Sequence, residues 1–397
     1  MWGFLTSLND VLIPHLQNVF TLSNFQSSLV QAAFFSAYFV MAIPSERAVT
    51  RLGYQKTMVT GLLLAMVGAL GFFPAASTAS YPLFLGALFV LATGIVFLQT
   101  SANPYVTALG PPEGASSRLN LTQAFNSLGT TLGPWLGGML FFTGAAKTAE
   151  QMAAMDAPAL EAYRATEASS VQLPYVAIAG MLGLLAVLIW RSKLPRLAHV
   201  EDGAAGTTYG QALRVKHLFF GVVAIFLYVG AEVSIGSFLL RFFRLPSIVG
   251  PELSEVAASR YVSLYWGSAM VGRFIGAGLM QRLRPGRVLM TAAVVAALLC
   301  AVGALATGKV AMFGVIAIGL FNSVMFPTIF ALAVDRLGPL TGKGSGLLIM
   351  AIVGGAVLPP LMGKIYDTIG LQPAFFLPLV CYLFIAWYGA KGHAVRG

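Results

Sequence analysis

The chain has 397 residues, of which 57% are hydrophobic and only 10% are charged. Soluble domains carry roughly 25% charged residues, so this composition, with a mean hydropathy of +0.81, excludes a soluble protein and predicts an integral membrane protein. The net charge of +10 does not indicate nucleic acid binding, because the basic residues lie at the ends of apolar segments and not in one dense patch.

Twelve apolar segments are long enough to cross a lipid bilayer as helices, since about 20 helical residues span roughly 30 Å of hydrocarbon. In chain order they cover residues 1–20, 25–49, 54–74, 81–109, 118–142, 171–190, 217–242, 257–282, 287–307, 310–335, 344–363 and 372–390. The sequence therefore predicts an all-α membrane protein with twelve transmembrane helices.

The longest polar segment on the predicted cytoplasmic side, residues 191–216, divides the chain into two sets of six spans. We predict an N-terminal six-helix half at 1–190, a cytoplasmic linker at 191–216 and a C-terminal six-helix half at 217–397. The halves repeat each other: "GTTLGPWLG" from Gly129 aligns with "GAVLPPLMG" from Gly355, and "NDV" from Asn9 aligns with "AEV" from Ala231. Secondary transporters are often two such halves with the substrate held near the midplane.

Most of the 24 lysine and arginine residues, Arg273 among them, fall in one set of alternate loops. The other set holds Lys147, Arg164, Arg241, Arg244, Arg260, Lys309 and Lys364. Because loops rich in basic residues stay in the cytoplasm, both termini are predicted to be cytoplasmic in a multi-pass protein of the cell inner (plasma) membrane.

Two acids, Asp10 and Glu232, occupy corresponding positions of the repeat and are expected to approach one cavity from opposite sides. No basic residue of their own spans lies near enough to neutralise them, so each carboxylate must be protonated, hydrated, hydrogen-bonded or bound to a cation. Pro14 also leaves the carbonyl of Asp10 without its usual helical partner. We predict that both acids couple transport to a cation; the alternative is that they join helices by hydrogen bonds.

Amide side chains form the predicted substrate site. Gln123 and Asn126 align with Ile349 and Ile352 of the second half, so the first half carries more of the polar contacts. Amides both donate and accept hydrogen bonds, as sugar hydroxyls do. The other candidate ligands are Asn9, Gln31, Gln99, Asn103, Trp266, Asn322 and Phe326, where the two rings could stack on a sugar. Each amide could instead bond two helices, and each ring could simply pack.

No cofactor is predicted, and the four histidines and two cysteines are not spaced as a metal site. A sodium ion near Asp10 is the one cation site considered. No nucleophile and base pair occurs within the spans, which disfavours an enzyme.

Several stretches together resemble the major facilitator superfamily, in particular its fucose:proton symporter branch and the bacterial glucose/galactose permeases. They include "LNDVLIPHLQ", "FLQTSANPYVTALG", "SRLNLTQAFNSLGTTLGP" and "YVGAEVSIGSFL". In the L-fucose permease the coupling acids lie in the first and fourth spans. Asp10 matches the first of these, whereas Gln99 stands at the second, and Glu232 stands where the fucose permease has glutamine. The resemblance thus implies glucose, galactose or mannose rather than fucose.

The expected function is cation-coupled symport of a hexose into the cell by alternating access, with a proton or sodium as the co-transported ion, by a monomer embedded in the bilayer. Glu232 could serve as a sugar hydroxyl acceptor or as a second ion ligand. The alternatives are a drug/proton antiporter of the same fold, an uncoupled sugar uniporter and, less favoured, a membrane-embedded enzyme or sensor.

Overall fold

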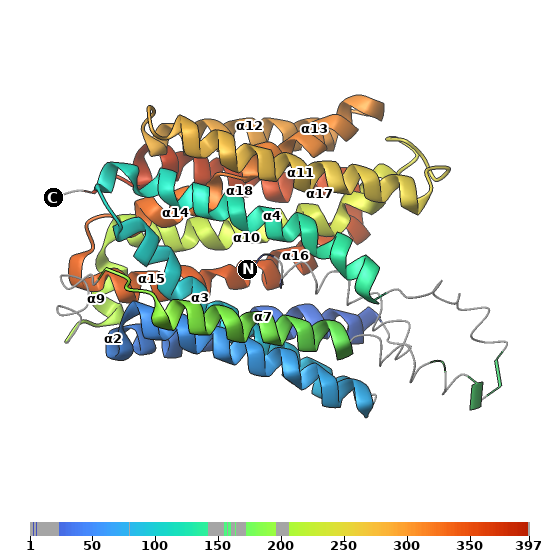
Figure 1. Cartoon of the computed structure of the whole chain (residues 1–397). Helices are drawn as coiled ribbons and strands as arrows, with labels where there is room; N and C mark the ends of the chain where they lie inside the picture. The colour runs from blue at the N-terminus through green and yellow to red at the C-terminus, as the bar shows by residue number, and fades with distance from the viewer. Residues whose placement is uncertain are drawn as a thin grey trace. The chain divides into compact units, whose positions relative to one another are not determined.

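The computed structural model describes residues 3, 5, 24–78, 80–141, 155–156, 158–159, 163, 172–195 and 206–395. Within these ranges the chain is helical and no strand occurs. Figure 1 labels the helices. Asn9 and Asp10, and with them most of the predicted span 1–20, lie outside the described residues.

The helices group into two compact units. Unit 1 comprises Met1–Ala102 with Asn126–Arg196, and unit 2 comprises Asn103–Phe125 with Leu197–Gly397. The helices α3 (Tyr81–Ala108) and α4 (Ala115–Phe141) each contribute to both units. The predicted halves 1–190 and 217–397 divide the chain differently, by the repeat in the sequence, and they stay a prediction.

Unit 1 contains α2 (Asn24–Ser77), which holds the two predicted spans 25–49 and 54–74. They meet at a kink at Gly53, whose φ of 78° and ψ of 171° fall in a region open essentially only to glycine. The helix α7 (Gln172–Arg191) packs along α2 (Figure 1). The first part of α3 also packs closely, because a Cβ at Gly94 would collide with the α2 backbone at Gly61 and Ala65. Glycine thus lets two apolar helices approach each other at backbone distance.

Unit 2 is arranged around α10, which packs against α14, α16 and α18, while α13 contacts both α11 and α12. The helices of this unit, besides the shared α3 and α4, are α9 (Tyr209–Arg214), α10 (Lys216–Phe243), α11 (Glu255–Leu279), α12 (Pro285–Leu305), α13 (Gly308–Asn322), α14 (Met325–Ala333), α15 (Thr341–Met350), α16 (Gly354–Ile369), α17 (Leu371–Ala374) and α18 (Phe376–Trp387). Glu232 lies on α10 and therefore on the central helix of the unit.

Two predicted spans are interrupted. The predicted span 310–335 forms α13 and α14, which are separated at Ser323 and Val324, and the span 344–363 forms α15, a 3-10 turn at Ala351–Val353 and α16. A broken helix leaves backbone groups without helical partners, and within a bilayer these groups need partners from the protein. The first break meets this need, because the carbonyl groups of Asn322 and Ser323 accept hydrogen bonds from side chains of α10 and α11.

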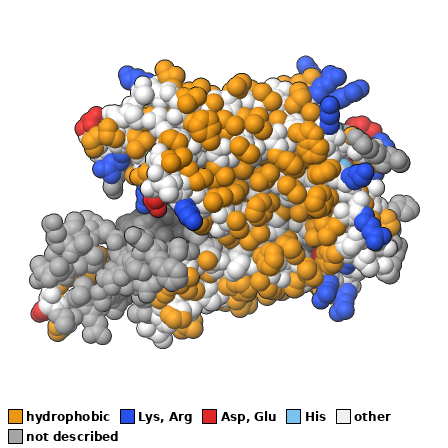
Figure 2. All heavy atoms as spheres, turned by 180° about the vertical axis from the view of Figure 1, so that it is seen from behind, with side chains coloured by type: hydrophobic (Ala, Val, Ile, Leu, Met, Phe, Trp, Pro, Cys, Tyr) orange, Lys and Arg blue, Asp and Glu red, His pale blue; other side chains and the backbone are white. Residues whose placement is uncertain are grey.

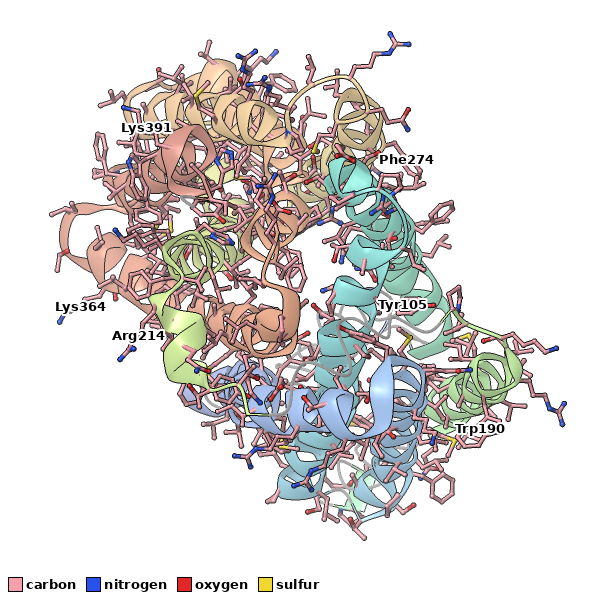
Figure 3. The ribbon with its side chains drawn as sticks, turned by 90° about the vertical axis from the view of Figure 1, so that its left-hand side faces the viewer. Tyr105, Trp190, Arg214, Phe274, Lys364 and Lys391 are labelled. Carbon is pink, nitrogen blue, oxygen red and sulfur yellow. The ribbon has the colours of Figure 1, made fainter. Side chains whose placement is uncertain are left out.

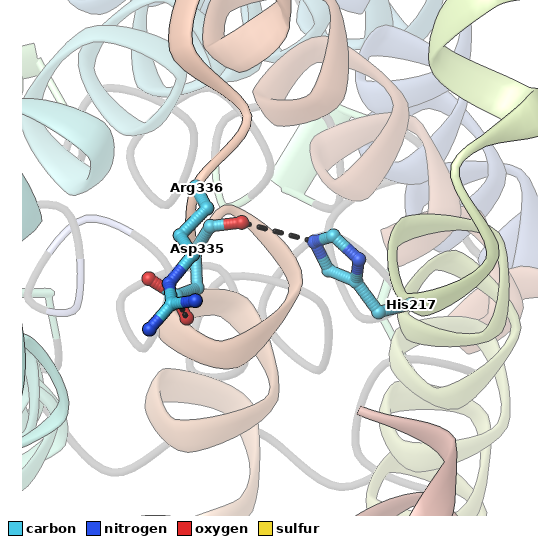
Figure 4. A network of polar contacts seen from close by, with 3 residues as sticks. All are labelled: His217, Asp335 and Arg336. Atoms are coloured by element: carbon cyan, nitrogen blue, oxygen red, sulfur yellow. Dashed lines mark hydrogen bonds and ion pairs between the residues drawn. The ribbon is translucent and has the colours of Figure 1, made fainter. Parts of the chain in front are cut away.

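One end of unit 2 is joined by polar contacts around His217 at the start of α10. The His217 Nε2–H donates to the Asp335 carbonyl at 3.0 Å, and the Arg336 guanidinium lies 4.0 Å from the Asp335 carboxylate (Figure 4). The Tyr388 hydroxyl donates to the His217 carbonyl at 3.2 Å. These contacts connect the ends of three segments that are far apart in the sequence.

Eight helical segments of the described ranges are long and apolar enough to cross a membrane. The kinked α2 accounts for two predicted spans, and the more polar α4 and α11 are not among the eight. The surface is that of a membrane-spanning protein. The described part of the face in Figure 2 is mainly apolar, and its lysine and arginine side chains lie in groups. The side chains of Arg214 and Lys364, which Figure 3 labels, point outward.

Candidate substrate and coupling site

The carboxylate of Glu232 has a basic neighbour. Glu232 is half-buried on α10, where the Tyr228 hydroxyl, one turn earlier, lies close to it and the Arg273 guanidinium of α11 attracts it electrostatically. Arg273 is also half-buried, and its Nε donates to the Ser323 carbonyl at 3.2 Å. Attraction between opposite charges is several times stronger here than in water.

The placement of Arg273 corrects one expectation. Arg273 was assigned to a polar loop, but it lies inside α11, six residues before the helix ends at Leu279. Glu232 was expected to have no basic residue of its own span near enough to neutralise it, and its basic neighbour Arg273 belongs to another helix. The proximity of the two side chains depends on how α10 and α11 pack, which a single span does not show.

A buried polar cluster surrounds Asn322 at the end of α13. Its Nδ2 donates to the Tyr265 hydroxyl at 2.9 Å, and its backbone carbonyl accepts from the Tyr228 hydroxyl at 3.0 Å. Asn322 Oδ1 and the Tyr382 hydroxyl are fully buried and lie close to each other, and neither has a hydrogen-bond partner of good geometry among the described residues. Because buried polar atoms are nearly always paired, these two atoms can pair with each other or with a ligand or water.

Two other predicted amides of unit 2 bond to each other. Gln123 Nε2 donates to Asn103 Oδ1 at 3.4 Å, and both side chains are buried. The Asn103 Nδ2 group has no partner among the described residues. It therefore offers two N–H donors, which complement the acceptor that Asn322 offers.

The predicted amides of unit 1 differ in their surroundings. Gln99 is buried and its Nε2 donates to the Tyr38 hydroxyl at 2.9 Å. Asn126 is half-buried and its Oδ1 accepts from the Gly3 backbone N–H at 2.6 Å. Gln31 is exposed on α2. Only the first two of these side chains therefore have structural partners in the described part of unit 1.

The two candidate aromatic residues belong to unit 2. Trp266 is 41% exposed and packs edge-to-face on Tyr265 with ring centroids 5.1 Å apart. Phe326 is half-buried at the start of α14 and lies 6.2 Å from the Phe330 ring. Trp266 is thus a partly exposed ring next to Tyr265 of the Asn322 cluster, whereas the ring contact of Phe326 is with Phe330 of its own helix.

Three buried polar residues were missed by the sequence reasoning. Arg273 could have been found, since a charged residue inside an apolar run of spanning length indicates a functional position. Glu46 is fully buried and accepts a hydrogen bond from the Thr50 hydroxyl at 2.8 Å. Asn120 is fully buried, and its Nδ2 donates to Thr328 Oγ1 at 3.2 Å. Glu46 and Asn120 lie near the ends of predicted spans, where the sequence does not distinguish a buried side chain from a solvated one.

No three His, Cys, Asp or Glu side chains of the described ranges gather into a possible metal site. The sodium position considered near Asp10 falls outside those ranges.

The helical spans and the buried polar clusters define a multi-pass membrane protein of the transporter type. The family model of the Major Facilitator Superfamily matches residues 2–352. The chain belongs to this superfamily, and its members' fold has twelve spans, so the predicted family and the predicted all-α fold are confirmed.

Similar proteins narrow the class further. The chain is 48% identical over 392 residues to a glucose/galactose transporter of Brucella abortus biovar 1, which covers 99% of this chain and 91% of that protein. It is 36% identical to the L-fucose-proton symporter of Escherichia coli K12 over 97% of this chain and 89% of that protein. The crystal structure of the transporter FucP in its outward conformation matches with a TM-score of 0.90 and 34% identity, covering 98% of this chain and 95% of that one. The chain is accordingly a membrane transporter and not an enzyme.

Proposed function

We propose that the chain is a symporter that carries a hexose of the glucose, galactose or mannose type into the cell together with a proton. The observation that carries this proposal is the likeness, over nearly the whole chain, to a glucose/galactose transporter at 48% identity and to an L-fucose-proton symporter at 36% identity. The buried amides of both units support it, since they match the donor and acceptor character of sugar hydroxyls.

In this proposal Asp10 carries the coupling ion. A bare carboxylate is costly to enclose in a dry interior, so the site closes only after Asp10 has taken up a proton, or a sodium ion, from outside. The membrane potential supplies about 2.3 kcal/mol per charge per 100 mV, which corresponds to nearly fiftyfold accumulation.

Glu232 has a different role in the same proposal. Arg273 provides a permanent positive charge near it, which partly offsets the cost of burying the Glu232 carboxylate. Between the two roles considered for this residue, we assign that of a sugar hydroxyl acceptor. Asn322 Oδ1 and Asn103 Nδ2, each buried without a partner among the described residues, would add an acceptor and a donor.

The remaining sugar ligands and the topology are also proposals. Gln123 and Asn126 would exchange their present contacts for sugar hydroxyls, with Trp266 stacking on the sugar ring. Asn9, Gln31, Gln99 and Phe326 are the further candidate ligands.

We place both termini in the cytoplasm and the chain in the cell inner membrane. In this proposal the chain is a monomer that works by alternating access between the predicted halves 1–190 and 217–397.

The decisive test is Asp10→Asn in protein reconstituted into vesicles. We expect this variant to lose uphill sugar uptake but to keep sugar exchange down its gradient, because a neutral amide needs no cation. The control is Asp367→Asn, the same chemical change at an exposed residue of α16. Retention of active accumulation by Asp10→Asn would contradict the assigned role.

The same vesicles separate the alternatives. Uptake after an imposed pH step indicates a proton, uptake after a sodium step indicates sodium, and equal uptake without either step indicates a uniporter. Lipophilic cations that compete with hexoses for binding would favour a drug/proton antiporter. We expect only the pH step to drive accumulation.

A further inference from the structure

A groove opens on the surface of unit 2 where α11 and α12 both lie against α13. Its volume of about 310 Å³ lies at the lower end of the range for ligand pockets, about 300–1,000 Å³. The lining is mainly apolar and includes Ile275, Leu279, Leu283, Val288, Leu320 and Phe321, with Arg287 as its charged residue. The groove lies apart from Glu232 and the Asn322 cluster, none of whose residues lines it.

Two glycines in the lining let α13 pack closely against α11. A Cβ at Gly272 would collide with the Leu320 carbonyl oxygen, and one at Gly276 would collide with the Val324 side chain, so α13 approaches α11 at backbone distance. Beside them Ile275 is 52% exposed and Leu279 is 45% exposed. The groove is therefore an open apolar channel on a membrane protein, and it needs an apolar occupant to supply van der Waals contacts.

The groove ends at a cluster of three arginines, two in the turn between α11 and α12 and the third, Arg287, in the first turn of α12. The side chains of Arg282, Arg284 and Arg287 are exposed and form no hydrogen bond or ion pair within the described ranges. Gly286 of the same turn abuts His393, which places this end of the groove beside the C-terminal segment. Three positive charges at the mouth of an apolar channel complement a molecule with an anionic head and a hydrocarbon tail.

The groove is short enough to lie within one leaflet of the bilayer. Gly272 and Leu279 are seven residues apart, or about 10 Å along a helix, and the arginine turn follows directly. Half of the hydrocarbon thickness is about 15 Å. The arginines can therefore lie at the level of lipid headgroups while the apolar part faces acyl chains.

We propose that this groove binds an anionic phospholipid, with an acyl chain between α11 and α12 and its phosphate on Arg284 and Arg287. Arginine binds phosphate through paired N–H donors, and a net negative headgroup is favoured over a zwitterionic one by the three charges. A second copy of the chain fits less well. Two copies share one orientation in the membrane, so their arginine clusters would meet at the same level and repel each other.

The test measures lipids bound to the full-length protein in detergent. The protein is delipidated and offered equal amounts of phosphatidylglycerol and phosphatidylcholine, and the lipids bound per chain are counted by native mass spectrometry. We expect one phosphatidylglycerol per chain. The variant Arg284→Gln/Arg287→Gln should weaken its binding about thirtyfold, since each basic residue near an anionic headgroup contributes about fivefold. Arg191→Gln/Lys193→Gln removes two exposed charges at the end of α7 and should change nothing.

A second pair of variants tests the apolar part without changing the arginines. Thr291→Trp fills the groove from its exposed side, whereas Val294→Trp, at an exposed position further along α12, lies outside the lining. We expect the first variant to lose the lipid and the second to keep it. Equal retention of both lipids by the unmodified protein, or unchanged binding in Thr291→Trp, would overturn the proposal. A dimer that dissociates in Thr291→Trp would also overturn it, by assigning the groove to a second copy.

Discussion

The buried polar residues around Gln99 in unit 1 and around Glu232 in unit 2 are organised differently. Gln99 is neutral and donates to Tyr38, and the nearby Ser45 hydroxyl donates to Thr100 Oγ1 at 2.9 Å. Around Glu232 the groups include an acid, the guanidinium of Arg273 and an acceptor, Asn322 Oδ1, that has no partner within the described ranges. Around Gln99 the polar side chains form hydrogen bonds with one another. Around Glu232 there are charged side chains and a hydrogen-bond acceptor that a substrate can use.

This difference distinguishes polar residues that hold helices together from those that can act on a substrate. An interhelical hydrogen bond between neutral groups contributes only about 0.6 kcal/mol on average in membrane proteins. Charged residues in a span are far more expensive and generally mark a functional position. We therefore expect substitutions near Glu232 to have larger effects than substitutions near Gln99.

The largest effect is expected for Arg273→Gln, which leaves the Glu232 carboxylate without its cation. Removing one partner of a direct buried ion pair costs about 3–5 kcal/mol. Glu232 and Arg273 are half-buried and interact electrostatically rather than through a direct ion pair, so we expect a loss at or below the lower end of this range. The free energy of unfolding in mixed micelles measures this loss. Glu232→Gln added to Arg273→Gln should restore most of it, because no uncompensated charge then remains.

The control for this pair is Arg260→Gln, which removes an exposed arginine of the same helix. It should leave the free energy of unfolding nearly unchanged. If the double variant were no more stable than Arg273→Gln alone, the charge interaction would not be what Arg273 contributes.

A smaller loss in the free energy of unfolding is expected for Asn322→Ala. The Tyr265 hydroxyl loses the Nδ2 donor in a fully buried position, and an unsatisfied buried group costs about 1–3 kcal/mol. Asn322→Ala and Tyr265→Phe should be non-additive in the free energy of unfolding, since both remove the same hydrogen bond. Additive losses would show that the two side chains act independently; Thr368→Ala, at an exposed residue, serves as the control.

The smallest effect on stability is expected for Gln99→Leu. It removes one neutral hydrogen bond to Tyr38, so the free energy of unfolding should fall by about 0.6 kcal/mol, and Tyr38→Phe should do the same. The KM for sugar transport distinguishes more clearly between a structural role and a ligand role of Gln99. If Gln99 only joins helices, both variants should keep the KM for sugar, whereas a KM raised more than about tenfold in Gln99→Leu alone would make Gln99 a sugar ligand.

Hydropathy located the helices closely because the bilayer sets their length. The predicted span 217–242 is observed as Lys216–Phe243, and 171–190 as Gln172–Arg191. Hydropathy did not reveal the interruptions at Ser323 and at Ala351–Val353, because the residues at these breaks are small or apolar and read as part of one continuous span.

The candidate site was predicted less completely than the fold. The sequence alone identified Glu232 as an unusual charge and the amides Gln123 and Asn322 as polar residues within spans. That Gln123 bonds to Asn103, and that Gln99 bonds to Tyr38, followed only from the structure. Hydrogen bonds between helices depend on the rotation of each helix about its axis, which a single sequence does not encode locally.

The sequence by itself determined that the protein spans a membrane, where most of its helices begin and end, and that charges are carried inside them, because the transfer of each residue into hydrocarbon depends on its own chemistry. Only the tertiary structure decided that Arg273 lies close enough to Glu232 to attract it electrostatically and that α11, α12 and α13 enclose a groove ending in arginines. Both features arise between helices, where distance and orientation are set by packing.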